Sequence, residues 1–205
     1  TTVESVRALC EMFRCTVLFS TATQPEYHAR KDIKFSPREI IPDPAELYEK
    51  TRRVAVEWKI RPGMEIPLED IAGKMSQYGS VCCVVNRKDH AHKLYDSLRD
   101  ACGDDGCFHI STDMCKAHRD VVLAEIKRRT ASGEPCRLVS TSCIEAGVDL
   151  DFEVMFRALA PLDSIVQCAG RCNRNGRGSG KMTVFVPAED RLYPSRSYEY
   201  AAGCV

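Results

Sequence analysis

Residues 138–177 read LVSTSCIEAGVDLDFEVMFRALAPLDSIVQCAGRCNRNGR, and the fold prediction starts from this stretch. Its first part, residues 139–149, begins as an apolar strand, breaks into small and hydroxylated residues, and reaches a glycine followed by an acid. Buried parallel strands end in this way where they meet a ligand. Its second part, residues 167–177, spaces Gln167, Arg171 and Arg174 at i, i+4 and i+7. On a helix these positions share one face, so we expect an amide and two guanidinium groups to converge on one anion.

Length and charge limit the possible functions. A chain of 205 residues is long enough for one domain with extensions and a sizeable core. Its 29 basic and 29 acidic residues cancel, so the molecule has no overall positive field to attract nucleic acid. Any contact with nucleic acid must therefore come from a local groove.

The twelve cysteines do not form a metal-binding or disulfide pattern. There is no Cys-x-x-Cys, and the pairs Cys102/Cys107 and Cys168/Cys172 are five and four residues apart. Four others lie in apolar, strand-like runs, where a thiol acts as a small hydrophobic group: Cys82, Cys83, Cys136 and Cys143. Without a secretory signal or an apolar run of 18 residues, we expect a reducing cytosol and no membrane association.

Hydrophobic periodicity predicts alternating strands and helices. Helices are expected at residues 2–13, 67–78, 89–101, 118–130 and 162–172. Strands are expected at residues 15–20, 53–58, 80–85, 108–110, 137–140, 154–157 and 182–186. Residues 25–49 are polar and contain several prolines, which indicates a linker. The alternation predicts βαβ units and a mostly parallel sheet.

Polar residues follow three of the predicted strands. They are Asn86 and Arg87, Ser111 and Thr112, and Thr141. Loops at the carboxyl ends of parallel strands bind ligands, and short donors at helix starts suit phosphates. We therefore expect these loops to hold the backbone of a nucleic-acid strand. The alternative is that Asn86, Ser111 and Thr112 only cap the helices that follow them.

Three motifs in this order resemble those of superfamily 2 helicases. Thr21-Ala22-Thr23 follows a predicted strand and looks like motif III, residues 141–149 look like motif V, and Gln167-x-x-Gly170-Arg171-x-x-Arg174 looks like motif VI. The longer stretches FSTATQP, ISTDMCKAHR, VSTSCIEAGVDLDF and RALAPLDSIVQCAGRCNRNG resemble one family more closely. That family is the helicase half of the signature helicase-nuclease of type I CRISPR interference. The resemblance covers the first 25 residues and about residues 50–187.

The resemblance implies an α/β fold with a three-layer, RecA-like domain at residues 50–187. Residues 1–24 would be a remnant of the preceding RecA-like domain, residues 25–49 the interdomain linker and residues 188–205 a tail. Such helicases bind ATP between their two RecA-like domains. The parent protein would be an ATP-dependent helicase of the prokaryotic cytoplasm, active in antiviral defence, with single-stranded DNA and the CRISPR surveillance complex as partners.

The resemblance also assigns roles to individual residues. Arg171 and Arg174 would face the γ-phosphate of ATP, with Gln167 assisting. Gly147 and Asp149 would contact the nucleotide, Thr141 would contact a DNA phosphate, and residues 21–23 would couple the two domains. Cys168 departs from the arginine that many superfamily 2 proteins have at this position, which puts only that extra contact in doubt.

Two expected parts of an ATPase are missing from the sequence. There is no Gly-x-x-x-x-Gly-Lys-Ser/Thr loop and no Asp-Glu-x-His/Asp after an apolar strand. The five histidines are scattered and indicate no metal site, and no nuclease half is evident. We therefore expect the parent to use ATP and Mg²⁺, but this chain to bind neither and to be inactive alone. The alternatives are another superfamily 2 DNA or RNA helicase, or a non-catalytic module that binds single strands or a protein.

Overall fold

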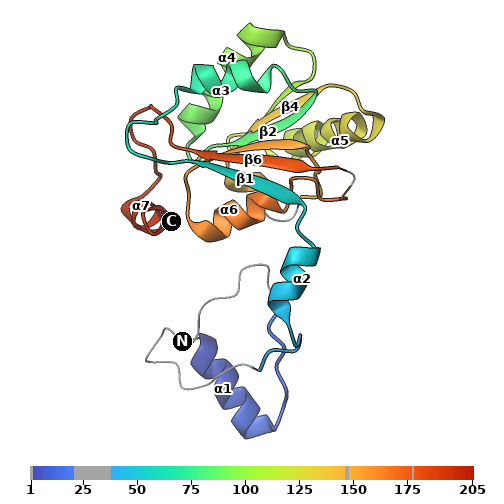
Figure 1. Cartoon of the computed structure of the whole chain (residues 1–205), viewed down its shortest axis with the longest axis vertical. Helices are drawn as coiled ribbons and strands as arrows, with labels where there is room; N and C mark the ends of the chain where they lie inside the picture. The colour runs from blue at the N-terminus through green and yellow to red at the C-terminus, as the bar shows by residue number, and fades with distance from the viewer. Residues whose placement is uncertain (1, 21–37, 146–147, 177) are drawn as a thin grey trace. The chain divides into compact units, whose positions relative to one another are not determined.

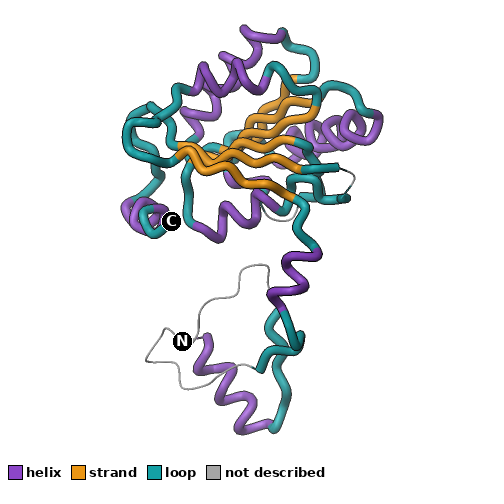
Figure 2. The backbone as a smooth tube through the Cα atoms, in the orientation of Figure 1, coloured by secondary structure: helices purple, strands orange, loops and turns teal. Residues whose placement is uncertain are grey.

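The computed structural model describes residues 2–20, 38–145, 148–176 and 178–205. The chain divides into two compact units, Thr1–Arg52 and Arg53–Val205 (Figures 1 and 2). Residues 21–23 and Gly147, which were predicted site residues, lie outside the described residues.

The first unit contains two helices, α1 (Thr2–Phe13) and α2 (Pro44–Lys50). Helix α1 confirms the prediction, whereas α2 lies in the expected linker and starts where the Asp43 carboxylate accepts a hydrogen bond from the amide of Glu46, 2.9 Å away. The predicted strand at residues 15–20 is wrong: the segment forms no strand. A strand needs a partner, and the described residues of this unit provide none.

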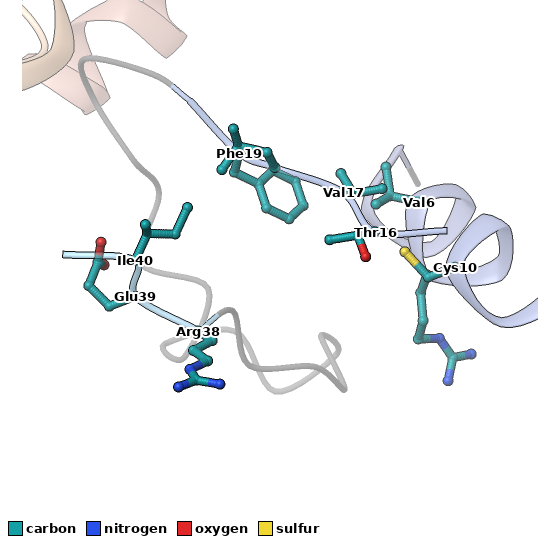
Figure 3. Close-up of a pocket in the computed structure, with 10 residues that line it drawn as sticks. Val6, Cys10, Thr16, Val17, Phe19, Arg38, Glu39 and Ile40 are labelled. Atoms are coloured by element: carbon teal, nitrogen blue, oxygen red, sulfur yellow. The ribbon is translucent and has the colours of Figure 1, made fainter. Parts of the chain in front are cut away.

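Apolar and polar side chains of the first unit line an open hollow of about 630 Å³. Figure 3 shows Val6 and Cys10 of α1 on one side of it, with residues 16–19 and 38–40 around the rest. None of this unit's residues whose burial is described is fully buried, and Met12, Phe13 and Leu18 are exposed. The described part of this unit therefore lacks a closed hydrophobic core.

The second unit is built on one parallel sheet of six strands in the order β1-β6-β5-β2-β4-β3. The strands are β1 (Val54–Lys59), β2 (Ser80–Val84), β3 (Cys107–Ile110), β4 (Cys136–Ser140), β5 (Val154–Ala158) and β6 (Gly180–Phe185). The helices are α3 (Leu68–Met75), α4 (Lys88–Cys102), α5 (Lys116–Ser132), α6 (Leu162–Ala169), α7 (Arg196–Ala202) and the short 3₁₀ turn η2 (Ser142–Ile144).

Helices cover both faces of this sheet (Figure 1). Val81 and Cys83 of β2 pack in one core cluster with residues of α3 and α4, whereas Cys82 and Val84 pack in another with Ile126 of α5 and residues of α6. The alternation follows from the period of two along a strand, and burial on both faces explains why these strands are continuously apolar. The prediction of a three-layer α/β domain with a parallel sheet is confirmed.

The segment after the last strand contains a further helix. The expected tail, residues 188–205, contains helix α7, which starts where the Ser195 hydroxyl accepts a hydrogen bond from the amide of Tyr198, 3.3 Å away. Within the described ranges, no helix is both long and apolar enough to span a lipid bilayer.

Candidate functional site

The carboxyl edge of the sheet gathers the predicted strand-end residues. Asn86 and Arg87 follow β2, Thr141 follows β4, and Ser111 and Thr112 follow β3. Because β2, β4 and β3 are adjacent and parallel, these three loops lie side by side at one edge.

These side chains differ in how far they are exposed and in whether they are already engaged by other residues. Thr112 is exposed, whereas Ser111 is buried and its hydroxyl accepts a hydrogen bond from the amide of Asp113 at 3.3 Å. Thr141 is also buried, and its hydroxyl lies 3.6 Å from the Cys143 sulfur. The guanidinium of Arg87 is bound by Asp89, with Nη2 and Oδ2 2.7 Å apart.

Asn86 is held by four contacts inside the domain. Its Nδ2 donates to the carbonyl oxygens of Leu159 at 2.8 Å and Leu192 at 3.3 Å. Its Oδ1 accepts from Arg157 at 2.8 Å and from the Tyr198 hydroxyl at 3.0 Å. Because both ends of the amide are engaged, this geometry favours a bracing role for Asn86 over direct contact with a ligand.

The predicted helical face of Gln167, Arg171 and Arg174 is wrong. Helix α6 ends at Ala169, so only the half-buried Gln167 is helical, and the two arginines lie in the turn that follows. The turn is fixed because Asn173 has a left-handed backbone (φ 45°) and its amide donates to the Phe152 carbonyl at 2.8 Å. We call residues 170–176 the arginine loop.

The arginine loop lies at the amino edge of the sheet, opposite the strand-end loops. The backbone of Cys172 forms an isolated parallel β-bridge with Phe152, which lies two residues before β5. The Asn173 side chain donates a hydrogen bond to the carbonyl of Arg53, just before β1. Residues 141–145 and 148–152, which we call the crossing segment, lie on the path of the chain from Thr141 at the carboxyl edge to Phe152 at the amino edge. The two predicted groups of ligand-binding residues are therefore joined by one segment of chain.

The two arginines are held differently. Arg171 is half-buried, and its Nη2 donates to the Glu145 carbonyl at 2.9 Å, while its buried Nε has no partner among the described residues. Burial, followed by the positive charge of Arg174, lowers the pKa of Arg171. Arg174 is 43% exposed, and its Nε pairs with Asp149 Oδ1 at 2.9 Å. The loop therefore brings together two cations whose charges are only partly compensated.

One buried network was missed in the sequence. Arg157, in the middle of the apolar run VMFRA, is fully buried, and its Nη2 lies 2.9 Å from Glu145 Oε1 and 3.0 Å from the Tyr198 hydroxyl. The Glu145 oxygen is close enough for an ion pair but is not aligned for a hydrogen bond, so we treat the contact as a charge pair. A single charged residue in an otherwise apolar strand could have indicated this network, because a charge buried in a strand needs partners.

An all-parallel sheet covered by helices on both faces is the architecture of a RecA-like domain. Residues 77–177 match the family model described as "CRISPR-associated nuclease/helicase Cas3, C-terminal". This match confirms the resemblance to the Cas3 helicases seen in the sequence.

Individual relatives agree with this assignment. The chain is 50% identical over 72 residues to the CRISPR-associated nuclease/helicase Cas3 of Haloferax volcanii, covering 33% of this chain and 8% of that protein. It is 30% identical over 135 residues to the protein of the same name from Methanothermobacter thermautotrophicus, covering 62% of this chain and 16% of that protein. The chain thus spans less than a fifth of either relative.

Solved structures share the fold. The crystal structure of T. fusca Cas3-ATP superposes with a TM-score of 0.56 at 20% identity, over 82% of this chain and 21% of that chain. A chain in a structure of a CRISPR RNA-guided surveillance complex, pre-nicking, superposes with a TM-score of 0.53 at 20% identity, over 73% of this chain and 21% of that chain.

Proposed function

We propose that residues 50–187 form the second RecA-like domain of an ATP-dependent, single-stranded DNA helicase of CRISPR interference. Residues 1–24 would belong to the preceding RecA-like domain, and residues 25–49 would be the linker. The parent would work in the prokaryotic cytoplasm with its own first RecA-like and nuclease domains and with the CRISPR surveillance complex. The observation that carries this proposal is the pair of cations on the arginine loop.

The arginine loop fits a phosphate group. Arg171 has a buried Nε without a partner, and its guanidinium and that of Arg174 repel each other. An anion between them would supply acceptors and offset the repulsion, and guanidinium groups suit phosphate oxygens. We propose that both arginines stabilise the charge that develops on the γ-phosphate, with Gln167 nearby. Asp149 would hold Arg174 until the nucleotide arrives, and Gly147 would approach the nucleotide.

The carboxyl edge would contact the DNA backbone. Of the predicted residues there, Thr112 is exposed and Arg87 is partly exposed, and Ser111 and Thr141 would contribute from more buried positions. Hydroxyl and guanidinium groups bind phosphates without reading sequence. We expect contacts of this kind to serve a strand-tracking motor, in which affinity must not depend on base identity.

ATP would bring the reactive phosphate, and this chain's part would be to bind and orient it. The described residues contain no group of three or more His, Cys, Asp or Glu side chains that could hold a metal ion. The phosphate-cradling sequence is missing as well. We therefore propose that the isolated chain does not hydrolyse ATP, with or without single-stranded DNA, and binds ATP no better than about millimolar. Turnover by the pure chain, stimulated by DNA, would contradict the division into two domains.

The arginine roles can be tested in the whole helicase-nuclease that we propose contains this chain. Arg174→Ala should lower the ATPase rate constant by a factor of about 10³ or more, as removal of an arginine finger does. Arg174→Lys should rescue poorly, because lysine lacks the planar fork. Arg99→Ala is a matched control: Arg99 is 42% exposed and pairs with Asp104, as Arg174 is 43% exposed and pairs with Asp149.

Both arginine-to-alanine variants should melt close to the unmodified protein, since exposed ion pairs contribute less than about 1 kcal/mol. Thr141→Ala should instead weaken single-strand affinity and DNA stimulation while sparing nucleotide binding. Two titrations separate these effects, one of ATP at saturating DNA and one of DNA at saturating ATP. The proposal is wrong if Arg174→Ala unfolds the protein, or if it fails in the same way as Thr141→Ala in both titrations.

A further inference from the structure

The buried guanidinium of Arg157 joins parts of the chain that are distant in sequence. Its Nη1 donates to the Asn86 side chain at 2.8 Å and to the carbonyls of Val84 at 3.3 Å and Ala158 at 2.9 Å. Its Nη2 donates to the Tyr198 hydroxyl of α7 at 3.0 Å and pairs with Glu145. Because the side chain is fully buried, any movement of these partners would leave a charge without compensation.

Glu145 contacts both Arg157 and Arg171 of the arginine loop. Its carboxylate pairs with Arg157 at 2.9 Å, and its own carbonyl oxygen accepts the hydrogen bond from Arg171 Nη2, also at 2.9 Å. Glu145 is itself buried, so its side chain and its carbonyl are fixed together. A shift of the carboxylate would therefore displace the acceptor that holds the Arg171 guanidinium.

We propose that Arg157 is a positioning residue that links helix α7 to Arg171 through Glu145. Tyr198 fixes one end of the link, because its hydroxyl both accepts from Arg157 and donates to Asn86. The importance of the link for phosphate chemistry rests on the function proposed above for Arg171. The link itself is a property of the described structure and is tested without ATP or DNA.

The alternative is that Tyr198 only attaches α7 to the domain. In that case the loss of its hydroxyl would affect α7 and its immediate contacts, and the Arg171 side chain would remain unchanged. The two possibilities therefore differ at Arg171, which has no contact with Tyr198 among the hydrogen bonds and ion pairs of the described residues.

The test uses the 205-residue chain labelled with ¹⁵N and the NMR signals of the arginine Nε–H groups. The Arg171 signal is identified by its loss in Arg171→Lys. We expect Tyr198→Phe to shift or broaden this signal, and to speed amide hydrogen exchange in the crossing segment about three- to tenfold, the usual effect of losing one hydrogen bond. Tyr200→Phe is the matched control, because Tyr200 lies on the same helix but is 80% exposed.

Specific changes at Arg171 and in the crossing segment, absent in Tyr200→Phe, would support the link. The proposal is overturned if Tyr198→Phe alters only α7 and the Arg157 signal. It is equally overturned if exchange rises uniformly across the chain, including α5, because that result would show general destabilisation. If the link is found and Arg174→Ala nevertheless leaves the ATPase of the whole protein intact, the proposed function fails while the structural link stands.

Discussion

Replacing Glu145 with glutamine tests how much the buried charge pair contributes to the fold. Glu145→Gln preserves the shape of the side chain but removes the negative charge that pairs with the fully buried Arg157, whose other partners among the described residues are neutral. Removing one member of a buried ion pair costs about 3–5 kcal/mol. Burial raises the pKa of Glu145 and outweighs the lowering effect of Arg157, so the carboxylate is itself costly to keep charged. We therefore expect the free energy of unfolding to fall by an amount at the lower end of this range, about 3 kcal/mol.

Thermal unfolding of the chain at neutral pH, followed by circular dichroism, measures this loss. For a domain of this size, 1 kcal/mol corresponds to roughly 2–4 °C, so the melting temperature should fall by roughly 6–12 °C. Glu57→Gln is the control, because Glu57 is 62% exposed and pairs with Lys59 at 3.1 Å on the surface. Its loss should stay below about 1 kcal/mol. If Glu145→Gln melts within about 2 °C of this control, the buried pair does not stabilise the domain as its geometry implies.

Three further predictions concern other parts of the chain. Hydrogen bonds from Arg128, joined by Arg129 at Glu125, lower the pKa of Glu125 and Glu134 to about 2, so their stabilisation is present above pH 4.5 and is lost as pH falls toward 2. Arg128→Ala should therefore reduce, but not abolish, this acid dependence of the melting temperature, because Arg129 still pairs with Glu125. Gly106→Ala should cost roughly 2 kcal/mol or more in urea unfolding, since φ is +75° and the new Cβ would meet a carbonyl oxygen at 2.6 Å, whereas Gly79→Ala meets nothing within 4 Å. The chain should self-associate more in size-exclusion chromatography than a version starting at residue 44; identical monomeric profiles would contradict this.

The sequence predicts the second unit well because its elements have strong, local signals. The continuous apolar run at residues 80–85 and the alternating pattern at residues 53–58 correspond to β2 and β1. Their place in one parallel sheet follows from the helices between them, since parallel strands need long crossover connections. The polar residues after three strands also fall at one edge of the sheet, as the topology requires.

The predictions that failed depend on contacts far apart in the sequence. Residues 15–20 are apolar enough for a strand, but strand formation requires a partner that the described part of the first unit lacks. Helix α6 has a helical pattern through Cys172, yet Phe152 binds the backbone of residues 171 and 173 and ends the helix early. From the sequence, Arg157 stands out only as a charged residue in an apolar strand. Its partners Glu145 and Tyr198 could not be predicted, because they come from distant segments.

The early end of α6 changes how the two arginines would act. On one helical face they would be equivalent, but in the loop the Arg171 side chain donates to the Glu145 carbonyl, whereas among the described residues the Arg174 side chain pairs with the exposed carboxylate of Asp149. A tethered guanidinium has a fixed position and loses little conformational entropy when an anion binds, whereas Arg174 must leave Asp149 and then become ordered. If the proposed function is correct, Arg171 would set the place of the phosphate and Arg174 would close on it. Arg171→Ala should then reduce both stability and nucleotide affinity, while Arg174→Ala should reduce mainly the rate of the chemical step.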